Sequence, residues 1–167
     1  TKNIKNIKRR IERRGKTKTK SIESQISLIT ENNENFFYGK NVLGYIEGMD
    51  PKLKNELIVI TAHYDHIGII NGKIHNGADD NASGTAALIE LARRMTKGEK
   101  PRRRVVFIAF SGEERGLLGS RFYAEAPLVP IEKTVAMFNY DMIGNLRDDQ
   151  LEIHGVGSGS TFDEVLD

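Results

Sequence analysis

The 167-residue sequence contains no cysteine and no long run of apolar residues. The absence of cysteine excludes disulfide bonds, thiolate metal ligands and cysteine nucleophiles. No stretch approaches the roughly 18–20 consecutive apolar residues that a membrane-spanning helix requires, so we expect no transmembrane segment. A metal site in this chain would therefore use nitrogen and oxygen ligands.

Charge is distributed unevenly along the chain. Residues 1–20 contain ten lysines and arginines and one acidic residue, whereas residues 21–167 contain 15 basic and 22 acidic residues. A basic run of this kind can bind nucleic acid or an anionic surface. No aromatic residue lies among these charges to stack on bases. We therefore interpret the run as a solvated segment and expect no nucleic-acid partner.

Alternating strand and helix patterns predict an α/β domain. The apolar runs at residues 57–60 and 105–110 are typical of strands buried on both faces. Helical periodicity predicts helices over residues 81–97 and 116–125. Further strands are expected at residues 21–30, 41–47 and 134–140 and at the beginning of 151–160. Strands that alternate with helices favour a largely parallel sheet.

Histidines and carboxylates follow the predicted strands where each strand ends. In open α/β sheets, functional residues gather in the loops past the carboxyl ends of the strands. The stretch "HYDH" follows the first buried run, "SGEE" follows the second, and "NGADDNASG" opens the first helix. The residues concerned are His63, Asp65, His66, Asp79, Asp80, Glu113, Glu114 and Asp141. We expect them to lie together at one edge of the sheet.

Carboxylates that converge at one place repel one another unless a positive charge lies among them. Arg115 is the only lysine or arginine in these loop tips, so the simplest counter-charge is one or two divalent metal ions. Imidazole and carboxylate ligands without thiolate fit Zn²⁺, and Mn²⁺ and Co²⁺ accept the same ligand types. In a two-metal site one carboxylate bridges ions that lie about 3.5–4 Å apart.

Four motifs, "AHYDH", "NGADDNASG", "SGEERGLLGS" and "NYDMIG", resemble in this order those of the zinc exopeptidase family of bacterial leucyl aminopeptidases. Glutamate carboxypeptidase II, the transferrin receptor and the glutaminyl cyclases are relatives in this resemblance, which covers about residues 40–157. It implies a three-layer α/β/α sandwich with a mixed, largely parallel central sheet (phosphorylase/hydrolase-like). Residues 36–167 would be the N-terminal portion of that catalytic domain, whose C-terminal part is missing. Residues 1–35 would be the basic tail of an upstream or inserted domain.

The resemblance also assigns metal ligands. His63 and Asp141 would bind a first zinc ion, Glu114 would bind a second, and Asp80 would bridge the two. Asp65 would accept the other ring N–H of His63, which fixes the tautomer and orientation of the imidazole.

The adjacent glutamates have different roles in the resemblance. Glu113 would be the general base, which takes a proton from a water between the metals and passes it to the leaving amine. Metal binding lowers the pKa of a water from 15.7 toward about 7, and zinc would polarise the scissile carbonyl. A free N-terminal amine held near the metals would make the enzyme a zinc-dependent aminopeptidase acting on peptide substrates.

The family pattern includes a fifth ligand, a histidine on the second zinc well downstream of Asp141. The histidine that follows Asp141 here, His154, lies at a position that the family does not use. We therefore expect an incomplete two-zinc site with weak occupancy and little activity. His66 would contact substrate or make a structural hydrogen bond. A cis peptide bond between Asp80 and Asn81 is expected if the site is intact, because relatives often have one there.

Two alternatives from other classes stay open. One is a glutaminyl cyclase-like acyltransferase, in which an internal amine replaces water. The other is a catalytically silent receptor-type relative that binds a partner, although the presence of four ligands and the base argues against it. The resemblance further implies export in a bacterium, to the periplasm, the medium or the cell surface.

Overall fold

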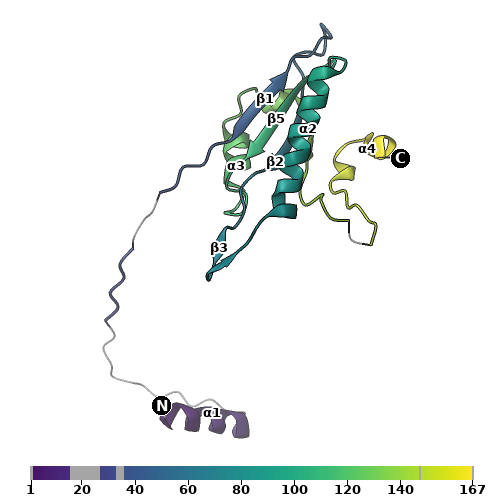
Figure 1. The fold of residues 1–167 in the computed structure, drawn as a ribbon. Coiled ribbons are helices and arrows are strands. Elements are labelled where there is room, and N and C mark those ends of the chain that lie inside the picture. The colour runs from purple at the N-terminus through teal and green to yellow at the C-terminus, as the bar shows by residue number, and fades with distance from the viewer. Residues whose placement is uncertain (1, 16–26, 33–35, 147, 167) are drawn as a thin grey trace. The chain divides into compact units, whose positions relative to one another are not determined.

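The computed structural model describes residues 2–15, 27–32, 36–146 and 148–166 (Figure 1). The chain forms two compact units, Thr1–Phe36 and Phe37–Asp167. Most of the strand predicted at residues 21–30 lies outside the described residues. Its described part, residues 27–30, is not a strand.

The first unit contains one regular element, helix α1 (Lys2–Arg14), among its described residues. Lysine, arginine and glutamate favour helices, and the Lys8 Nζ lies 4.0 Å from a Glu12 carboxylate oxygen one turn later. The helix is followed by Gly15, whose φ of 59° lets its N–H bond the carbonyl oxygen of Ile11 at 2.9 Å. Part of the basic segment is therefore helical, which its charge pattern alone does not predict.

The second unit is built on a four-stranded sheet with the order β1-β5-β2-β6. The strands are β1 (Val42–Ile46), β2 (Leu57–His63), β5 (Arg104–Phe110) and β6 (Thr134–Asn139). β2 pairs in parallel with both β5 and β6, while β1 runs antiparallel to β5. The prediction of a mixed, largely parallel sheet is confirmed, and the two apolar runs occupy its central positions.

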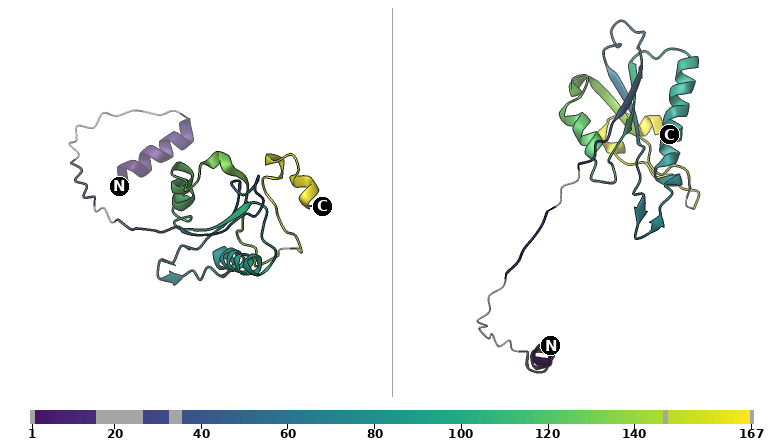
Figure 2. Two further views of the ribbon diagram at one scale, coloured as in Figure 1. Left: turned by 90° about the horizontal axis from the view of Figure 1, so that it is seen from above. Right: turned by 60° about the vertical axis from the view of Figure 1, so that its left-hand side comes forward.

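Helices cover both faces of this sheet. Side chains alternate along a strand, so Val105 and Phe107 pack on one face with Leu88 of α2 (Gly84–Lys97). Val106 and Ile108 belong to the cluster on the other face, which Tyr123 of α3 (Leu118–Glu125) covers. Figure 2 (left) shows α2 and α3 on opposite sides of the sheet. The predicted three-layer α/β/α sandwich is confirmed.

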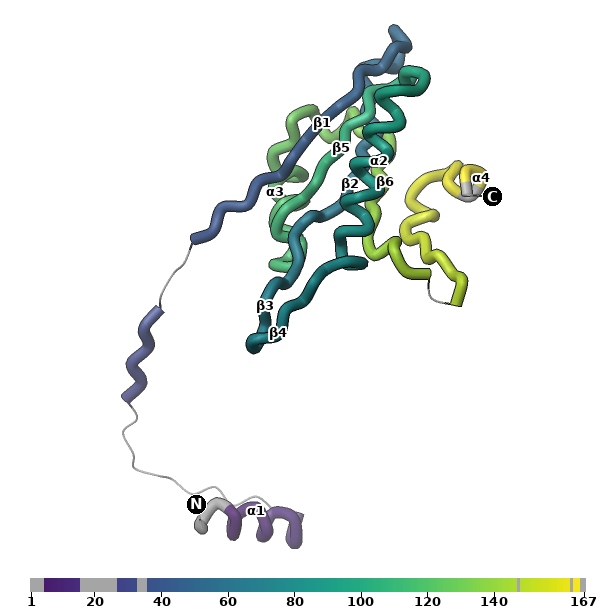
Figure 3. The backbone as a smooth tube through the Cα atoms, viewed as in Figure 1, coloured from purple at the N-terminus to yellow at the C-terminus, as the bar shows by residue number. Residues whose placement is uncertain are grey.

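A hairpin and an irregular turn connect β2 to α2. β3 (Ile69–Ile70) and β4 (Lys73–Ile74) form the hairpin (Figure 3). The turn η1 (Ala78–Ser83) follows, and α2 begins at Gly84 because Asp80 and Asn81 have non-helical backbone angles. The helix start predicted at Asn81 is thus three residues too early. The peptide bond between Asp80 and Asn81 is cis, as the resemblance predicts.

The C-terminal part of the unit is made of short elements: η2 (Ile131–Lys133), η3 (Val156–Ser158) and α4 (Phe162–Leu166). The strand predicted at the beginning of residues 151–160 does not form. Leu151 and Ile153 are 61% and 52% exposed, so neither side chain packs into a core that would hold a strand there. Among the helices of the described residues, none combines the length and apolarity needed to cross a bilayer.

Candidate metal centre

Three parallel strand ends meet at one edge of the sheet. β2 ends at His63, β5 leads into the turn that carries Glu113 and Glu114, and β6 is followed by Asp141. The strands pair in parallel across β2, with His63 opposite Phe110. Their carboxyl ends therefore point in the same direction. The sequence prediction that these residues share one edge is confirmed.

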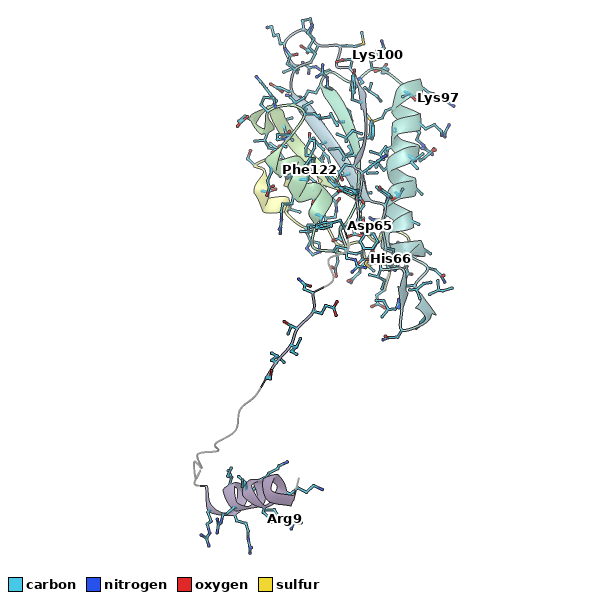
Figure 4. All side chains as sticks on the ribbon, turned by 90° about the vertical axis from the view of Figure 1, so that its left-hand side faces the viewer. Arg9, Asp65, His66, Lys97, Lys100 and Phe122 are labelled. Atoms are coloured by element: carbon cyan, nitrogen blue, oxygen red, sulfur yellow. The ribbon has the colours of Figure 1, made fainter. Side chains whose placement is uncertain are left out.

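The remaining predicted residues come from two loops at the same edge. Asp65 and His66 follow β2, and Asp80 lies in η1. Figure 4 shows Asp65 and His66 at one end of the second unit, with Lys97 and Lys100 at the other. The site is thus far from the loop that connects α2 to β5.

His63, Asp80 and Asp141 form a first group of ligand atoms. The Nε2 of His63 lies 3.2 Å from Asp80 Oδ1 and 3.3 Å from Asp141 Oδ1. The His63 side chain is only 3% exposed, and the three ligand atoms lie within 4.8 Å of one another. One imidazole and two carboxylates in such an arrangement can bind a single zinc ion and leave a fourth position open.

The other ring nitrogen of His63 is held by the backbone of Asp65. Nδ1 lies 3.0 Å from the Asp65 carbonyl oxygen but 3.8 Å from the nearer carboxylate oxygen. Asp65 therefore faces this ring nitrogen, as predicted, but through its backbone carbonyl oxygen and not through its carboxylate. The consequence for His63 is the same, because a proton held at Nδ1 leaves the Nε2 lone pair free for a metal.

The carboxylate of Asp65 instead holds the turn that follows β5. Asp65 Oδ1 accepts the backbone N–H of Glu113 at 3.1 Å, and Oδ2 accepts that of Glu114 at 3.4 Å. One side chain thereby fixes the backbone of both glutamates relative to the end of β2.

His66, Asp80 and Glu114 form a second group of ligand atoms. His66 Nδ1 lies 2.8 Å from Glu114 Oε1 and 3.9 Å from Asp80 Oδ2. The three atoms again lie within 4.8 Å of one another. Asp80 presents Oδ1 to the first group and Oδ2 to the second, so this carboxylate would be able to bridge two ions.

Glu113 lies beside the first group without belonging to it. Its Oε2 is 4.0 Å from His63 Nε2. Burial raises the pKa of Glu113, and the negative charges of Glu114, Asp141 and Asp65 raise it further against the opposing effect of His63. A carboxyl group with a raised pKa accepts a proton more readily than an ordinary glutamate.

The pKa of His63 reflects the same crowding of charge. Burial disfavours the imidazolium form, but Asp141, the Asp65 carbonyl and Glu113 outweigh burial, so the pKa of His63 is raised. A divalent cation among these groups would favour ionised carboxylates and a neutral imidazole. The donor set of imidazole and carboxylate at the end of a buried strand thus fits zinc.

Asn81 is a structural residue of the site that the sequence pattern does not identify. Its side chain is 2% exposed and donates from Nδ2 to the carbonyl oxygen of Tyr140 at 2.9 Å. Its Oδ1 accepts the N–H of Gly84 at 3.0 Å and that of Met142 at 3.3 Å. One amide therefore ties the start of α2 to the loop that carries Asp141.

Two neighbours of Asn81 hold the same loop further along. Asp79 Oδ1 accepts the N–H of Gly144 at 2.9 Å, so the Asp79 carboxylate bonds backbone, and it belongs to neither ligand group of the described residues. Ser83 Oγ accepts the N–H of Ile143 at 3.1 Å and donates to the Asp79 carbonyl oxygen at 2.6 Å. The position of Ser83 just before α2 suggests a helix cap, but its hydroxyl makes no capping bond there.

His75 and His154 lie outside both ligand groups found among the described residues. The His75 ring centroid is 6.5 Å from that of His66. The side chain of His154 is 88% exposed and lies 3.5 Å from Glu152.

The chain is similar to known proteins in sequence and in structure. Residues 41–166 match Peptidase family M28. Over 141 residues, the chain is 30% identical to aminopeptidase YwaD of Bacillus subtilis, an alignment that covers 84% of this chain and 29% of that protein. The chain therefore spans less than a third of the length of this curated relative.

The chain is also similar to solved structures of aminopeptidases. The zinc aminopeptidase BSAP of Bacillus subtilis is similar with a TM-score of 0.53 and 31% identity, over 67% of this chain and 29% of that chain. An aminopeptidase from Aneurinibacillus sp. strain AM-1 is similar with a TM-score of 0.52 and 36% identity, over 61% of this chain and 24% of that chain.

Proposed function

This chain belongs to peptidase family M28, and on that premise we propose that it acts as a zinc-dependent aminopeptidase on peptide substrates. The observation that carries the proposal is the pair of ligand groups that share Asp80 at the carboxyl edge of the sheet. Relatives named as aminopeptidases support the choice of reaction.

The chain's own residues divide into ligands and a base. His63, Asp80 and Asp141 would hold a first zinc ion, and Asp80 and Glu114 would contribute to a second. Zinc in such a site supplies Lewis acidity toward a carbonyl oxygen and lowers the pKa of water. The backbone carbonyl of Asp65 keeps the His63 proton at Nδ1, so that Nε2 faces the other ligands.

The position of Glu113 supports a role for this residue in moving a proton. Its carboxylate lies next to the first ligand group, while the Asp65 carboxylate fixes its backbone. A carboxylate in this position can take a proton from an attacking water and return it to the leaving amine. The neighbouring Glu114 points to the second group, so the two adjacent carboxylates have separate tasks.

The experiment compares the protein with its Glu113→Gln variant on aminoacyl p-nitroanilides, with zinc content measured in parallel. We expect hydrolysis to fall by about 100-fold or more in the variant, with zinc content unchanged. Glu125→Gln, a substitution of an exposed glutamate on α3, is the matched control and should retain activity. Zinc binding with unchanged hydrolysis in Glu113→Gln would contradict the role of the base.

Two substrates test the reaction class. An aminopeptidase requires a free N-terminal amine, so acetylation of the substrate should abolish hydrolysis. A peptide with N-terminal glutamine should lose that residue. Release of ammonia with formation of a cyclised N-terminus would instead support the glutaminyl cyclase alternative.

A further inference from the structure

The Nδ1 atom of His66 faces Glu114 and Asp80, the other members of the second ligand group, and makes no hydrogen bond in the described part of the chain. This nitrogen is completely buried, as is Glu114 Oε1, and the two atoms lie only 2.8 Å apart. Their geometry is not that of a hydrogen bond, and neither atom has another hydrogen-bond partner in the described part of the chain. Buried polar atoms without a partner are rare in folded proteins.

A divalent cation would satisfy both atoms at once. An imidazole nitrogen and a carboxylate oxygen are ordinary zinc ligands, each about 2.0–2.2 Å from the ion. Asp80 Oδ2 lies 3.9 Å from His66 Nδ1, and it faces this group while Oδ1 faces His63. Three ligand atoms therefore converge on one point from the end of β2, from η1 and from the turn after β5.

The position of the His66 ring is set by the fold. A Cβ atom at Gly77 would lie 2.9 Å from His66 Cγ, so the ring packs directly against the backbone of that glycine. Gly77 has a φ of 66°, which a residue with a side chain rarely adopts. The backbone at Gly77 thus leaves room for an imidazole that points toward Asp80 and Glu114.

We propose that His66 Nδ1 is a ligand of the second metal ion, together with Asp80 Oδ2 and Glu114 Oε1. This inference rests on the proposed function, because it assumes that the first group also binds zinc. It goes beyond the family pattern, which places the histidine of the second metal downstream of Asp141 and assigns no metal to His66. Both ions would then receive an imidazole from the loop at the end of β2, three residues apart.

The experiment measures metal binding directly. The protein is titrated with Co²⁺ while its visible absorption is recorded, and zinc stoichiometry and affinity are measured by competition with a chelator. We expect two equivalents in the wild type. In His66→Ala and His66→Gln the second equivalent should be lost or weakened by more than the roughly 10–100-fold that loss of a positioning partner costs.

Two control variants separate local from general effects. His75→Ala removes a neighbouring imidazole outside both groups and should keep two equivalents. His63→Ala should lose the first equivalent. Circular dichroism shows whether each variant is folded, and the Gln variant keeps a polar side chain at position 66 if the Ala variant is unstable.

X-ray absorption of the zinc-loaded protein distinguishes a ligand from a positioning residue. At a zinc concentration that still fills both sites in His66→Gln, the number of imidazoles per zinc should fall, because two ions then share the one imidazole of His63, whereas a positioning role would leave that number unchanged. Two equivalents of normal affinity in both His66 variants would overturn the inference but not the proposed function. If the wild type binds one ion through His63, the inference on His66 is overturned and the proposed function stands. If the wild type binds no zinc, the inference and the proposed function are both overturned.

Discussion

The side-chain amide of Asn81 makes hydrogen bonds to the residues on both sides of Asp141. Nδ2 bonds the carbonyl oxygen of Tyr140, the residue before Asp141, and Oδ1 accepts the N–H of Met142, the residue after it. The residue adjacent to Asp80 in the chain thus holds in place the loop that supplies another ligand of the first group.

Substitution Asn81→Ala should affect both stability and metal binding. It leaves a partly buried carbonyl oxygen and two N–H groups without their partner, which costs about 1–3 kcal/mol of the free energy of unfolding. We also expect zinc to bind more weakly, because Asp141 loses its support on both sides. Urea unfolding and chelator competition measure the two effects.

Asn81→Asp provides the graded comparison. The carboxylate can still accept the N–H groups of Gly84 and Met142 but cannot donate to Tyr140. Its loss of zinc affinity should therefore be smaller than that of Asn81→Ala. Equal zinc affinity in the wild type and both variants would show that the hydrogen bonds of Asn81 do not support Asp141.

Gly84→Ala should disturb the same loop by steric conflict. A Cβ atom at Gly84 would meet the carbonyl oxygen of Tyr140 and lie 2.5 Å from Asn81 Oδ1. Overpacking of this kind costs about 1–3 kcal/mol, although alanine is the better helix former. Gly44→Ala on β1 is the control, since a methyl group at that position would have no described atom within 4 Å. Thermal unfolding should show a clear loss of stability for position 84 and little change for position 44.

Asp65→Asn tests whether the carboxylate and the backbone carbonyl oxygen of Asp65 have separate roles. The substitution keeps the backbone carbonyl that faces His63, but it replaces one of the two oxygens that accept from Glu113 and Glu114. Hydrolysis should fall by roughly 10–100-fold, as for other partners that orient a site. Zinc affinity at the first site should stay nearly unchanged. A loss of that affinity as large as in His63→Ala would mean that the carboxylate does act on His63.

Glu90 should make stability depend on pH in the acid range. Hydrogen bonds from Arg93 and Arg94 lower the pKa of Glu90 to about 2. Because the folded pKa lies below the unfolded one, this contribution is present above about pH 4.5 and is lost as the pH falls toward about 2. Glu90→Gln should therefore be less stable than wild type at pH 7, with a difference that shrinks toward pH 2. Urea unfolding across this range, with Glu125→Gln as control, measures it.

Much of the sheet could be predicted because its central strands have a simple physical signature. A strand buried on both faces must be apolar throughout, and residues 57–60 and 105–110 are. The position of His63, Glu114 and Asp141 then follows from parallel pairing, since the carboxyl ends of such strands share an edge.

Other features depend on tertiary contacts that leave little trace in the sequence. The hydrogen bonds of Asn81 join residues about 60 positions apart, and an asparagine in a polar turn gives no sign of such partners. The sequence predicts only a substrate contact or a hydrogen bond for His66, because its contact with Glu114 depends on how two loops approach each other. The strand predicted near residue 151 follows local pattern alone, and Leu151 is exposed in the structure.

The parallel pairing of β2 with β6 should also determine when the first ligand group forms during folding. His63 and Asp141 are 78 residues apart in the chain, and a parallel pair requires a long crossover before its contacts can form. Contacts of such high sequence separation are slow to form because a large loop must close first. The first ligand group is complete only when β6 has docked beside β2. Uptake of Co²⁺ during refolding of His66→Gln, in which the second group is weakened, should therefore report the docking of β6 beside β2.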